Sequence, residues 1–295
     1  MDIRKMLDDA QAARDAKKQD EEKAKAGALR IGNSGVVTAD GRVLGTCHRI
    51  SMARLLGVEE PKARNTKLMF QAGELMEEGF AQLLVESGAC QVLRSDAISI
   101  DAKVMGSTRK LLGRPDVVLA DTDGKPVLGL EHKTAFSLNT AQTVGLEGKP
   151  KPDNLSQTAA YSHYLGIPFV LAYTSPSYFP LYFSDKKKYG MSSIAPFYRL
   201  FFTEWRDGTL FYRADNQTDW TQTLITAQGI EDYFALVAEM ADKKELGSRV
   251  DSSYADGAVH KYGENSSCKF CAFNQRCQDI EDKRISFDDW IKPLT

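Results

Sequence analysis

The stretch "LLGRPDVVLADTDGKPVLGLEHKTA", residues 111–135, constrains the fold most, because two apolar runs meet at an Asp-Gly turn. This pattern is typical of a β-hairpin closed by a tight turn. Pro115 precedes the first charged residue of interest, Asp116, and indicates an edge or bent position in the first strand. The sequence therefore predicts a hairpin that is mostly buried but carries Asp116, Glu131 and Lys133.

Glu131 and Lys133 are two residues apart, so on a strand they share one face while His132 points to the other. A tight hairpin brings Asp116 across from Glu131. Two acids and an amine in a half-buried place cost several kcal/mol unless something compensates them, and a divalent cation would do so. Carboxylates suit Mg²⁺ or Mn²⁺, and a neighbouring lysine can hold or activate water for phosphodiester hydrolysis. The alternative is a surface hairpin whose charges are simply solvated.

The composition describes an ordinary globular chain of 295 residues, 42% hydrophobic and 26% charged. Its formal net charge of -2 means that no global positive field indicates a nucleic-acid partner, so any basic surface must be local. There is no apolar run of signal-peptide or membrane-spanning type, and we expect a cytoplasmic protein without membrane contact.

Helical patterns flank the hairpin on both sides. We expect helices in "TCHRISMARLLGV", in residues 66–88, where Met69, Phe70, Met76, Phe80 and Leu83 lie on or near one face, and around residues 230–245. Another helix, "DNLSQTAAYSHYLGI", should have Asp153 or Asn154 as its N-terminal cap and stop at Gly166. Strands are expected in "PFVLAYTSP", "YRLFFTEW" and "TLFYRA", with a second hairpin turn at Asp207-Gly208.

These residues resemble a known family. "GRPDVVL" followed by "GLEHKT" is similar to the PD-(D/E)xK nuclease signature, and "QTAAY", Gln157 to Tyr161, resembles the Gln-x-x-x-Tyr motif of its RecB-like exonuclease branch. Residues four apart share a helical face. The resemblance also assigns a metal-binding acid to Glu77, four residues after Gly73, where RecB-like members usually have histidine; Glu74 stays a competitor.

The cysteines form a second pattern, because "CKFCAFNQRC" contains Cys268, Cys271 and Cys277 and a closed site needs a fourth ligand. Cys47 is the candidate. In RecB-like exonucleases with an iron-sulfur cluster, such as the CRISPR-associated exonuclease family and its phage relatives, one cysteine precedes the nuclease core and three follow it. The resemblance therefore implies a 4Fe-4S cluster; a zinc site made of the same thiolates is the alternative. Cys90 fits neither scheme.

The fold that the resemblance implies is the α/β restriction-endonuclease-like core, a mixed central sheet flanked by helices, with an iron-sulfur appendage. We predict a charged helical arm or frayed tail over residues 1–26, an N-terminal segment with the first cluster cysteine over 27–65, the nuclease core over 66–235, and a C-terminal helix with the three-cysteine segment over 236–295.

The resemblance implies a metal-dependent DNA exonuclease acting on single-stranded ends. Asp116, Glu131, Glu77 and the carbonyl of His132 would bind the metal, Lys133 would activate water, and Gln157 and Tyr161 would orient the lysine or the strand. DNA contacts are predicted at basic residues near the site, namely Arg114, Lys149, Lys151, Lys186, Lys187 and Lys188. The alternative classes are a DNA-end-binding or assembly protein that works with a recombination or CRISPR-adaptation partner, and a zinc-clasped DNA-binding protein.

Overall fold

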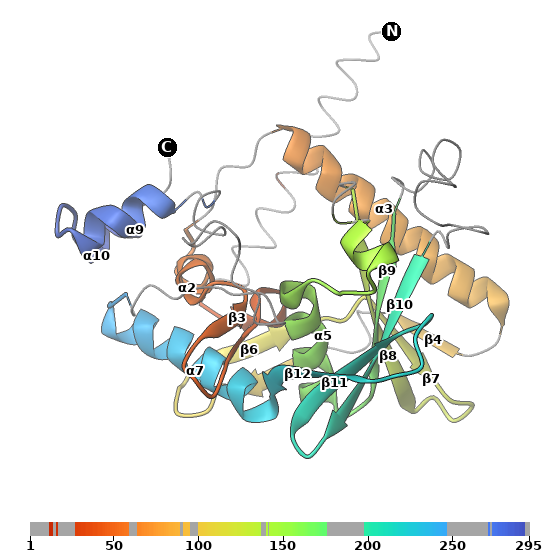
Figure 1. The fold of residues 1–295 in the computed structure, drawn as a ribbon. Helices are drawn as coiled ribbons and strands as arrows, with labels where there is room; N and C mark the ends of the chain where they lie inside the picture. The colour runs from red at the N-terminus through yellow and green to blue at the C-terminus, as the bar shows by residue number, and fades with distance from the viewer. Residues whose placement is uncertain are drawn as a thin grey trace, which may run out of the picture.

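The chain was analysed as a computed structural model that describes residues 12–13, 16, 27–58, 64–88, 91–94, 100–136, 140, 142–175, 198–246, 271 and 273–292. Its centre is a seven-stranded sheet (Figure 1). In spatial order the strands are β12 (Thr221–Thr226), β11 (Thr209–Ala214), β10 (Tyr198–Arg206), β9 (Phe169–Thr174), β8 (Pro126–Thr134), β7 (Val117–Ala120) and β4 (Gln91–Arg94). The predicted mixed sheet is confirmed, because β8 and β9 are parallel and the other pairs are antiparallel.

The first predicted hairpin exists, with one correction. β7 and β8 pair around a turn in which the Asp121 side chain accepts hydrogen bonds from the backbone N–H groups of Asp123 and Lys125 (3.0 and 2.9 Å). The first apolar run is not one strand, because its start forms β6 (Lys110–Gly113) in a separate sheet with β1 (Leu29–Arg30) and β5 (Ile100–Lys103). The Arg-Pro break therefore moves the chain from one sheet to the other, directly before Asp116.

The second predicted hairpin turn is also confirmed. β10 and β11 join at Asp207 and Gly208, which both have positive φ angles (48° and 74°), as the right-handed twist of a tight hairpin requires. The parallel pair β8 and β9 needs a long crossover, which the helix α5 (Pro152–Leu165) supplies. The N-cap of this helix is Lys151, and not the predicted Asp153 or Asn154, because Pro152 suits the first helical position. The helix ends at Gly166 as predicted.

Two cores lie on the two faces of the sheet. α5 and α7 (Ala227–Lys243) enclose the larger one, where residues such as Leu171 and Phe201 are fully buried. α3 (Arg64–Ser87) covers a smaller one over β7, β8 and β9, formed around Val117, Leu130 and Val170. Since side chains alternate along β8, Leu130 faces α3 while Glu131 faces α5.

The packing face of α3 differs from the expected one. Phe80 packs against the smaller core together with Ala81 and Leu84. Met69, Phe70 and Leu83 are instead exposed (49%, 54% and 66%). Helical periodicity identifies an apolar helix, but it does not decide which of several apolar stripes meets the sheet.

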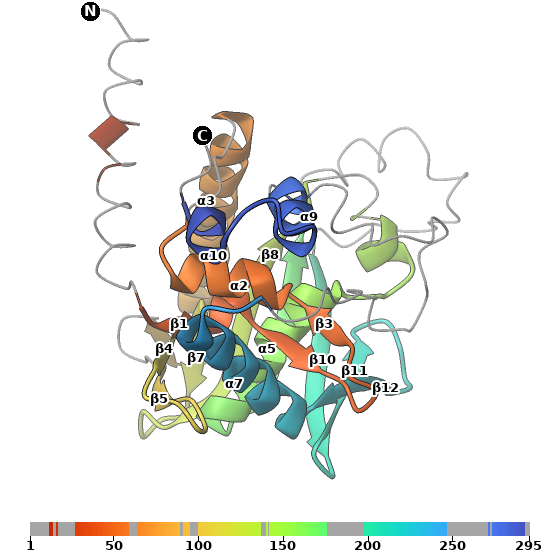
Figure 2. The same cartoon turned by 90° about the vertical axis from the view of Figure 1, so that its left-hand side faces the viewer.

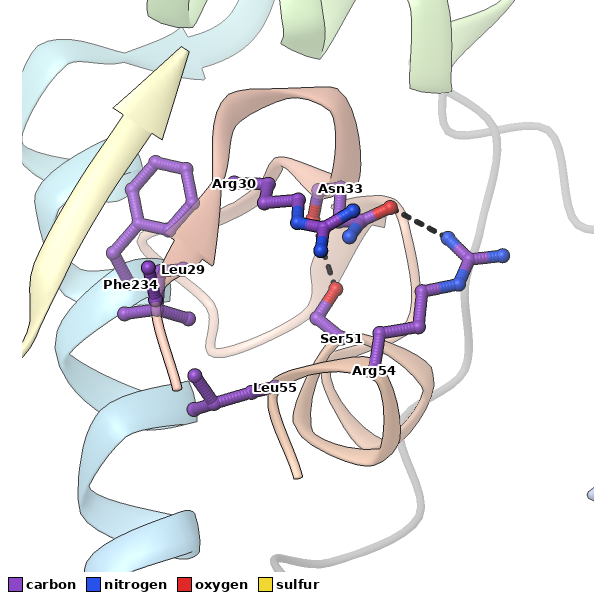
Figure 3. Close-up of a pocket in the computed structure, with 8 residues that line it drawn as sticks. Leu29, Arg30, Asn33, Ser51, Arg54, Leu55 and Phe234 are labelled. Carbon is purple, nitrogen blue, oxygen red and sulfur yellow. Dashed lines mark hydrogen bonds between the residues drawn. The ribbon is translucent and has the colours of Figure 1, made fainter. Parts of the chain in front are cut away.

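The N-terminal segment packs beside α7. It contains η1 (Ile31–Asn33), the paired strands β2 (Gly35–Val37) and β3 (Val43–Gly45), and the predicted helix α2 (His48–Leu55). A pocket of about 10 Å³ between these elements, lined by Arg30, Asn33, Ser51 and Arg54, has room for about one water molecule (Figure 3). Arg54 donates to the Asn33 side chain at 2.6 Å, along one of the dashed lines of Figure 3.

The C-terminal segment lies near α2, although the two are far apart in the sequence (Figure 2). It contains α9 (Asn274–Glu281) and α10 (Phe287–Trp290). Arg49, which is almost fully buried, donates to Glu281 at 2.6 Å and joins α2 to α9. Most of the predicted arm over residues 1–26, together with Cys90, lies outside the described residues, and the predicted domain boundaries stay predictions.

Candidate active site

Asp116 lies between the two sheets and is held against β8. Its Oδ2 atom accepts a hydrogen bond of 2.7 Å from the backbone N–H of His132. This contact holds the Asp116 carboxylate against the strand that carries Glu131, and the charge of the exposed Arg114 also acts on that carboxylate. The hairpin therefore brings the two predicted acids into one region of the molecule.

Glu131 and Lys133 form an ion pair on the α5 side of β8. The Nζ atom of Lys133 donates to Oε1 of Glu131 at 2.5 Å. The Glu131 side chain is 0% exposed and that of Lys133 is 27% exposed. The second oxygen of Glu131, Oε2, is buried and has no hydrogen-bond partner in the described part of the chain. A buried carboxylate oxygen without a hydrogen-bond partner costs free energy. The Oε2 atom of Glu131 is therefore an acceptor that a ligand could use.

The three acids interact strongly through charge. Burial, and then the charge of Asp116, raise the pKa of Glu131 to about 8, while Lys133 opposes this shift. Burial also raises the pKa of Asp116, against Lys133 and the His132 N–H. Burial and Asp116 raise the pKa of Glu77 to about 7. One lysine therefore does not compensate all three carboxylates when they are ionised.

Lys133 stays protonated in this surrounding. Burial alone would lower its pKa, but the charges of Glu131 and Asp116 raise the pKa above its ordinary value. A lysine with a raised pKa donates hydrogen bonds and does not remove a proton from water at neutral pH. Its role in a reaction would be to orient and to stabilise negative charge.

Glu77 reaches this group from α3. The charges of Asp116, Lys133 and Glu74 all act on the pKa of Glu77, and Glu77 in turn acts on Glu131. The electrostatics therefore connect Glu77 with the two hairpin acids.

The carboxylates do not form a preassembled metal centre. Among the residues that the structure describes, no group of three or more His, Cys, Asp or Glu side chains has the arrangement of a metal site. The chemistry of the donors nevertheless fits a hard divalent cation, since Glu131 has an unpartnered oxygen and all three acids have raised pKa values.

Tyr161 anchors the bend before Asp116. Its hydroxyl donates to the carbonyl oxygen of Arg114 at 2.8 Å, and its ring stacks on Phe169. Burial, followed by the charges of Glu131 and Asp116, raises the pKa of Tyr161 far above its ordinary range, although a hydrogen bond with Gln157 opposes the shift. Gln157 also approaches Gly32 of η1. The Gln-x-x-x-Tyr pair thus lies beside the acids, with Tyr161 contacting the backbone before Asp116.

Tyr173 and Arg199 lie in this region and were not predicted from the sequence. Lys133, Tyr173 and Arg199 occupy adjacent register positions on β8, β9 and β10. The Tyr173 hydroxyl accepts from the Lys151 backbone N–H and the Asn154 amide (3.1 and 2.8 Å). Arg199 donates to Asp215 and to the Gly145 carbonyl (2.5 and 2.7 Å).

Together these contacts fix the segment between β8 and α5, including η2 (Gln142–Leu146). Their signal in the sequence is a tyrosine and an arginine in otherwise apolar strands. That signal does not identify a partner, because Gly145, Lys151 and Asn154 are far from them along the chain.

The side chain of His132 lies on the opposite face, as predicted. Its Nε2 is 2.9 Å from the Thr174 hydroxyl, and its ring stacks on Phe80 of α3. Burial and then Lys133 lower the pKa of His132 to about 4, so the ring is neutral. A metal-binding role for its carbonyl stays a prediction.

The predicted DNA contacts are only partly described. Arg114, Lys149 and Lys151 are exposed near the site, and Lys149 lies 3.6 Å from Glu147. Lys186, Lys187 and Lys188 fall outside the described residues. The cavity of Figure 3 and a larger one of about 400 Å³ near Ser162 and Trp205 are lined by other residues.

The cysteines are described in part. Cys47 precedes α2, Cys277 is buried on α9, and Cys271 is half-buried just before that helix, while Cys268 falls outside the described residues. The three described cysteines do not form a metal-type group with one another. The iron-sulfur prediction therefore stays a prediction.

No protein-family model and no curated protein matches the chain. Among solved structures it is similar to an alkaline exonuclease, LHK-Exo from Laribacter hongkongensis, at 15% identity and a TM-score of 0.41, covering 76% of this chain and 95% of that one. The same exonuclease in complex with dAMP gives 15% identity and a TM-score of 0.39, covering 75% and 89%. At these values the likeness is too distant to assign the fold family or the function of this chain.

Proposed function

We propose that this chain is a metal-dependent DNA nuclease of the PD-(D/E)xK type, with a restriction-endonuclease-like fold, that acts as an exonuclease on single-stranded ends. One observation carries the proposal. A wholly buried glutamate, Glu131, is paired with Lys133 beside a second buried acid, Asp116, and keeps one oxygen without a partner. A fold retains such a costly arrangement more readily when the acids bind a cation.

Asp116, Glu131 and Glu77 would hold Mg²⁺ or Mn²⁺, together with the His132 carbonyl. When bound, the ion would polarise a phosphodiester oxygen and lower the pKa of an attacking water. Lys133 contributes a fixed positive charge that can orient water or a phosphate oxygen. Tyr161 keeps the bend before Asp116 in place through the Arg114 carbonyl. Water attack in line with the leaving oxygen would produce 5′-phosphates.

Digestion of end-labelled single-stranded and double-stranded DNA tests this proposal. We expect cleavage with Mg²⁺ or Mn²⁺, none with EDTA, and none by Asp116→Ala or Lys133→Ala, both of which should remain folded. Lys110→Ala removes an exposed lysine of the other sheet and is the matched control. Metal-dependent digestion by both site variants would refute the assignment.

A second candidate function is a DNA-end-binding or assembly subunit in which catalysis is secondary. It is favoured by the raised pKa of Lys133, which keeps this lysine protonated and so prevents it from acting as a base toward water. Under this alternative the same gel shows retention of labelled DNA without digestion. In this alternative the chain would hold DNA ends for a recombination or CRISPR-adaptation protein.

We further propose that Cys47, Cys268, Cys271 and Cys277 hold a 4Fe-4S cluster, with zinc as the alternative. The Arg49 and Glu281 ion pair supports this, because it brings the segments that contain the first and last of these cysteines together. Preparation under anaerobic conditions, with measurement of acid-labile sulfide, tests it. A colourless sample that contains zinc and no sulfide would replace the cluster by a zinc site, and the absence of both would remove the centre.

None of the described helices could span a membrane. A cytoplasmic location is part of the proposal.

A further inference from the structure

The outer face of β10 and β11, together with Trp220 directly before β12, carries a row of five side chains. Arginines and aromatic rings alternate in it, in the order Phe211, Arg206, Trp220, Arg213 and Phe202. The Arg206 guanidinium lies 4.8 Å from the Phe211 ring centre and 5.0 Å from that of Trp220, and the Arg213 guanidinium lies 5.5 Å from Trp220 and 5.2 Å from Phe202. We call these five residues the ladder.

The strand register explains how the ladder forms. Phe202 and Arg213 are direct partners across β10 and β11, and Phe211 is the partner of Glu204 on the same face. The alternate residues Phe201, Leu210 and Tyr212 point into the larger core under α5 and α7. The ladder therefore lies on the side of the sheet away from these helices.

No described helix covers this part of the sheet. α3 packs on β8 and β4, and its smaller core ends at Leu200 and Phe202. The Arg206 side chain on β10 is 40% exposed, and Leu224 on β12 is 41% exposed. The strands that carry the ladder lie toward the sheet edge formed by β12, at the opposite end of the sheet from β4 (Figure 1).

Most N–H groups of the two arginines have no hydrogen-bond partner among the residues that the structure describes. Arg206 donates to Glu204 at 3.0 Å, and Arg213 donates to the Gln217 carbonyl at 2.9 Å. A guanidinium has five N–H donors, which all lie in its plane and point outward from its edge. Stacking on an aromatic ring occupies the face of the guanidinium and leaves the N–H groups at the edge able to bind a partner. Because the rings already hold both guanidinium groups, less side-chain freedom is lost when an anion binds.

We propose that the ladder binds a single-stranded nucleic acid outside the acidic site. The alternation of cations and ring faces matches a strand in which phosphates alternate with bases, and such surfaces hold single strands without reading their sequence. The acid on this face of β10, Glu204, is already paired with Arg206. This proposal deepens the proposed nuclease function by naming a site for the strand, and it rests on that function for the identity of the strand.

Binding of a fluorescein-labelled oligothymidylate in EDTA, followed by fluorescence anisotropy, tests the ladder without cleavage. We expect Arg206→Gln/Arg213→Gln to weaken binding by about tenfold and to reduce the slope of log affinity against log salt by about 1.4, since each phosphate contact on a single strand contributes about 0.7. Trp220→Leu should weaken binding by roughly tenfold with the slope unchanged.

The matched control is Arg42→Gln/Lys110→Gln, which removes two cations from exposed ion pairs elsewhere. It should bind like the unsubstituted chain. Circular dichroism and thermal unfolding verify that each variant folds, and Arg206→Lys/Arg213→Lys, which keeps the charges, should retain the slope even if the glutamine variant is unfolded. Unchanged affinity and slope in the glutamine variant, or an equal loss in the control, would overturn the proposal, as would preferential binding of an acidic peptide.

Cleavage of the same oligonucleotide by the unsubstituted chain with Mg²⁺ is measured separately. Ladder-dependent binding without any cleavage would remove the nuclease proposal and leave the strand-binding site. Cleavage combined with unchanged binding by the ladder variants would remove the strand-binding site and leave the nuclease proposal.

Discussion

Glu131 is the residue whose environment departs furthest from that of an ordinary surface acid. It is 0% exposed, and its pKa of about 8 arises from burial and from the charge of Asp116. In the unfolded chain a glutamate has a pKa near 4.5. Between these two values the folded protein binds a proton that the unfolded chain does not bind. The metal-free protein should therefore lose stability as pH rises through this range.

Glu131→Gln tests this linkage. The amide cannot ionise, so the free energy of unfolding of this variant should fall less steeply between pH 4.5 and 8 than that of the unsubstituted chain. The slope should differ by up to about 1.4 kcal/mol per pH unit. Thermal and urea unfolding at several pH values in EDTA measure it.

Glu86→Gln, at the exposed end of α3, is the control and should leave the slope unchanged. Parallel slopes for Glu131→Gln and the unsubstituted chain would mean that Glu131 is ionised in the folded protein without cost.

At the scale of elements, the segment between β8 and α5 depends on contacts from strands that follow it in the chain. Tyr173 accepts from the Lys151 backbone and the Asn154 amide, and Arg199 donates to Gly145. Both strand residues are almost fully buried. They fix the entry to α5, the helix that carries Gln157 and Tyr161.

Tyr173→Phe removes the acceptor for both donors while keeping the ring in place. We expect a loss of about 1 kcal/mol in the free energy of unfolding and faster amide hydrogen exchange over residues 142–155, with little change in the rest of the sheet. Tyr198→Phe, at an exposed tyrosine, is the control. Equal exchange in the two variants would show that the Tyr173 hydroxyl does not hold this segment.

Local sequence patterns predicted those turns and helix ends that depend only on residues at the same place in the chain. The Asp207-Gly208 turn and the end of α5 at Gly166 follow from residues that tolerate positive φ angles. The separation of β6 from β7 could not be predicted in the same way, because β6 pairs with β1, which precedes it by about 80 residues of chain. The packing face of α3 likewise depends on which stripe the sheet accepts.

In the candidate site, too, some residues could be predicted from local patterns and others could not. Asp116, Glu131 and Lys133 could be placed together from strand alternation and a short turn. Tyr173, Arg199 and the ladder could not, since their partners are fixed by the register of β9, β10 and β11. Gly129 is a similar case, because only the packed structure shows that a side chain there would meet the Phe169 ring.

At the scale of the whole molecule, Arg49 connects segments from the two ends of the described chain. It is 4% exposed and pairs with Glu281 of α9 at 2.6 Å. The proposed cluster would reinforce this connection between α2 and α9. Without it, the ion pair is still a direct polar contact between these helices.

Arg49→Gln should therefore loosen the C-terminal segment. We expect faster amide exchange over residues 273–292 and a loss of about 1 kcal/mol in stability, since Glu281 is partly exposed and its charge is screened by solvent. Arg42→Gln, which breaks an exposed ion pair with Asp40, is the control. Unchanged exchange over residues 273–292 would mean that other contacts hold this segment.

The measurement that tests the central claim most directly is the titration of the protein with Mn²⁺, followed by electron paramagnetic resonance, at pH 8. The unsubstituted chain should bind one more Mn²⁺ than Asp116→Ala or Glu131→Gln, and Glu86→Gln should bind like the unsubstituted chain. Identical Mn²⁺ binding by all four proteins would contradict the claim that Asp116 and Glu131 share a divalent cation.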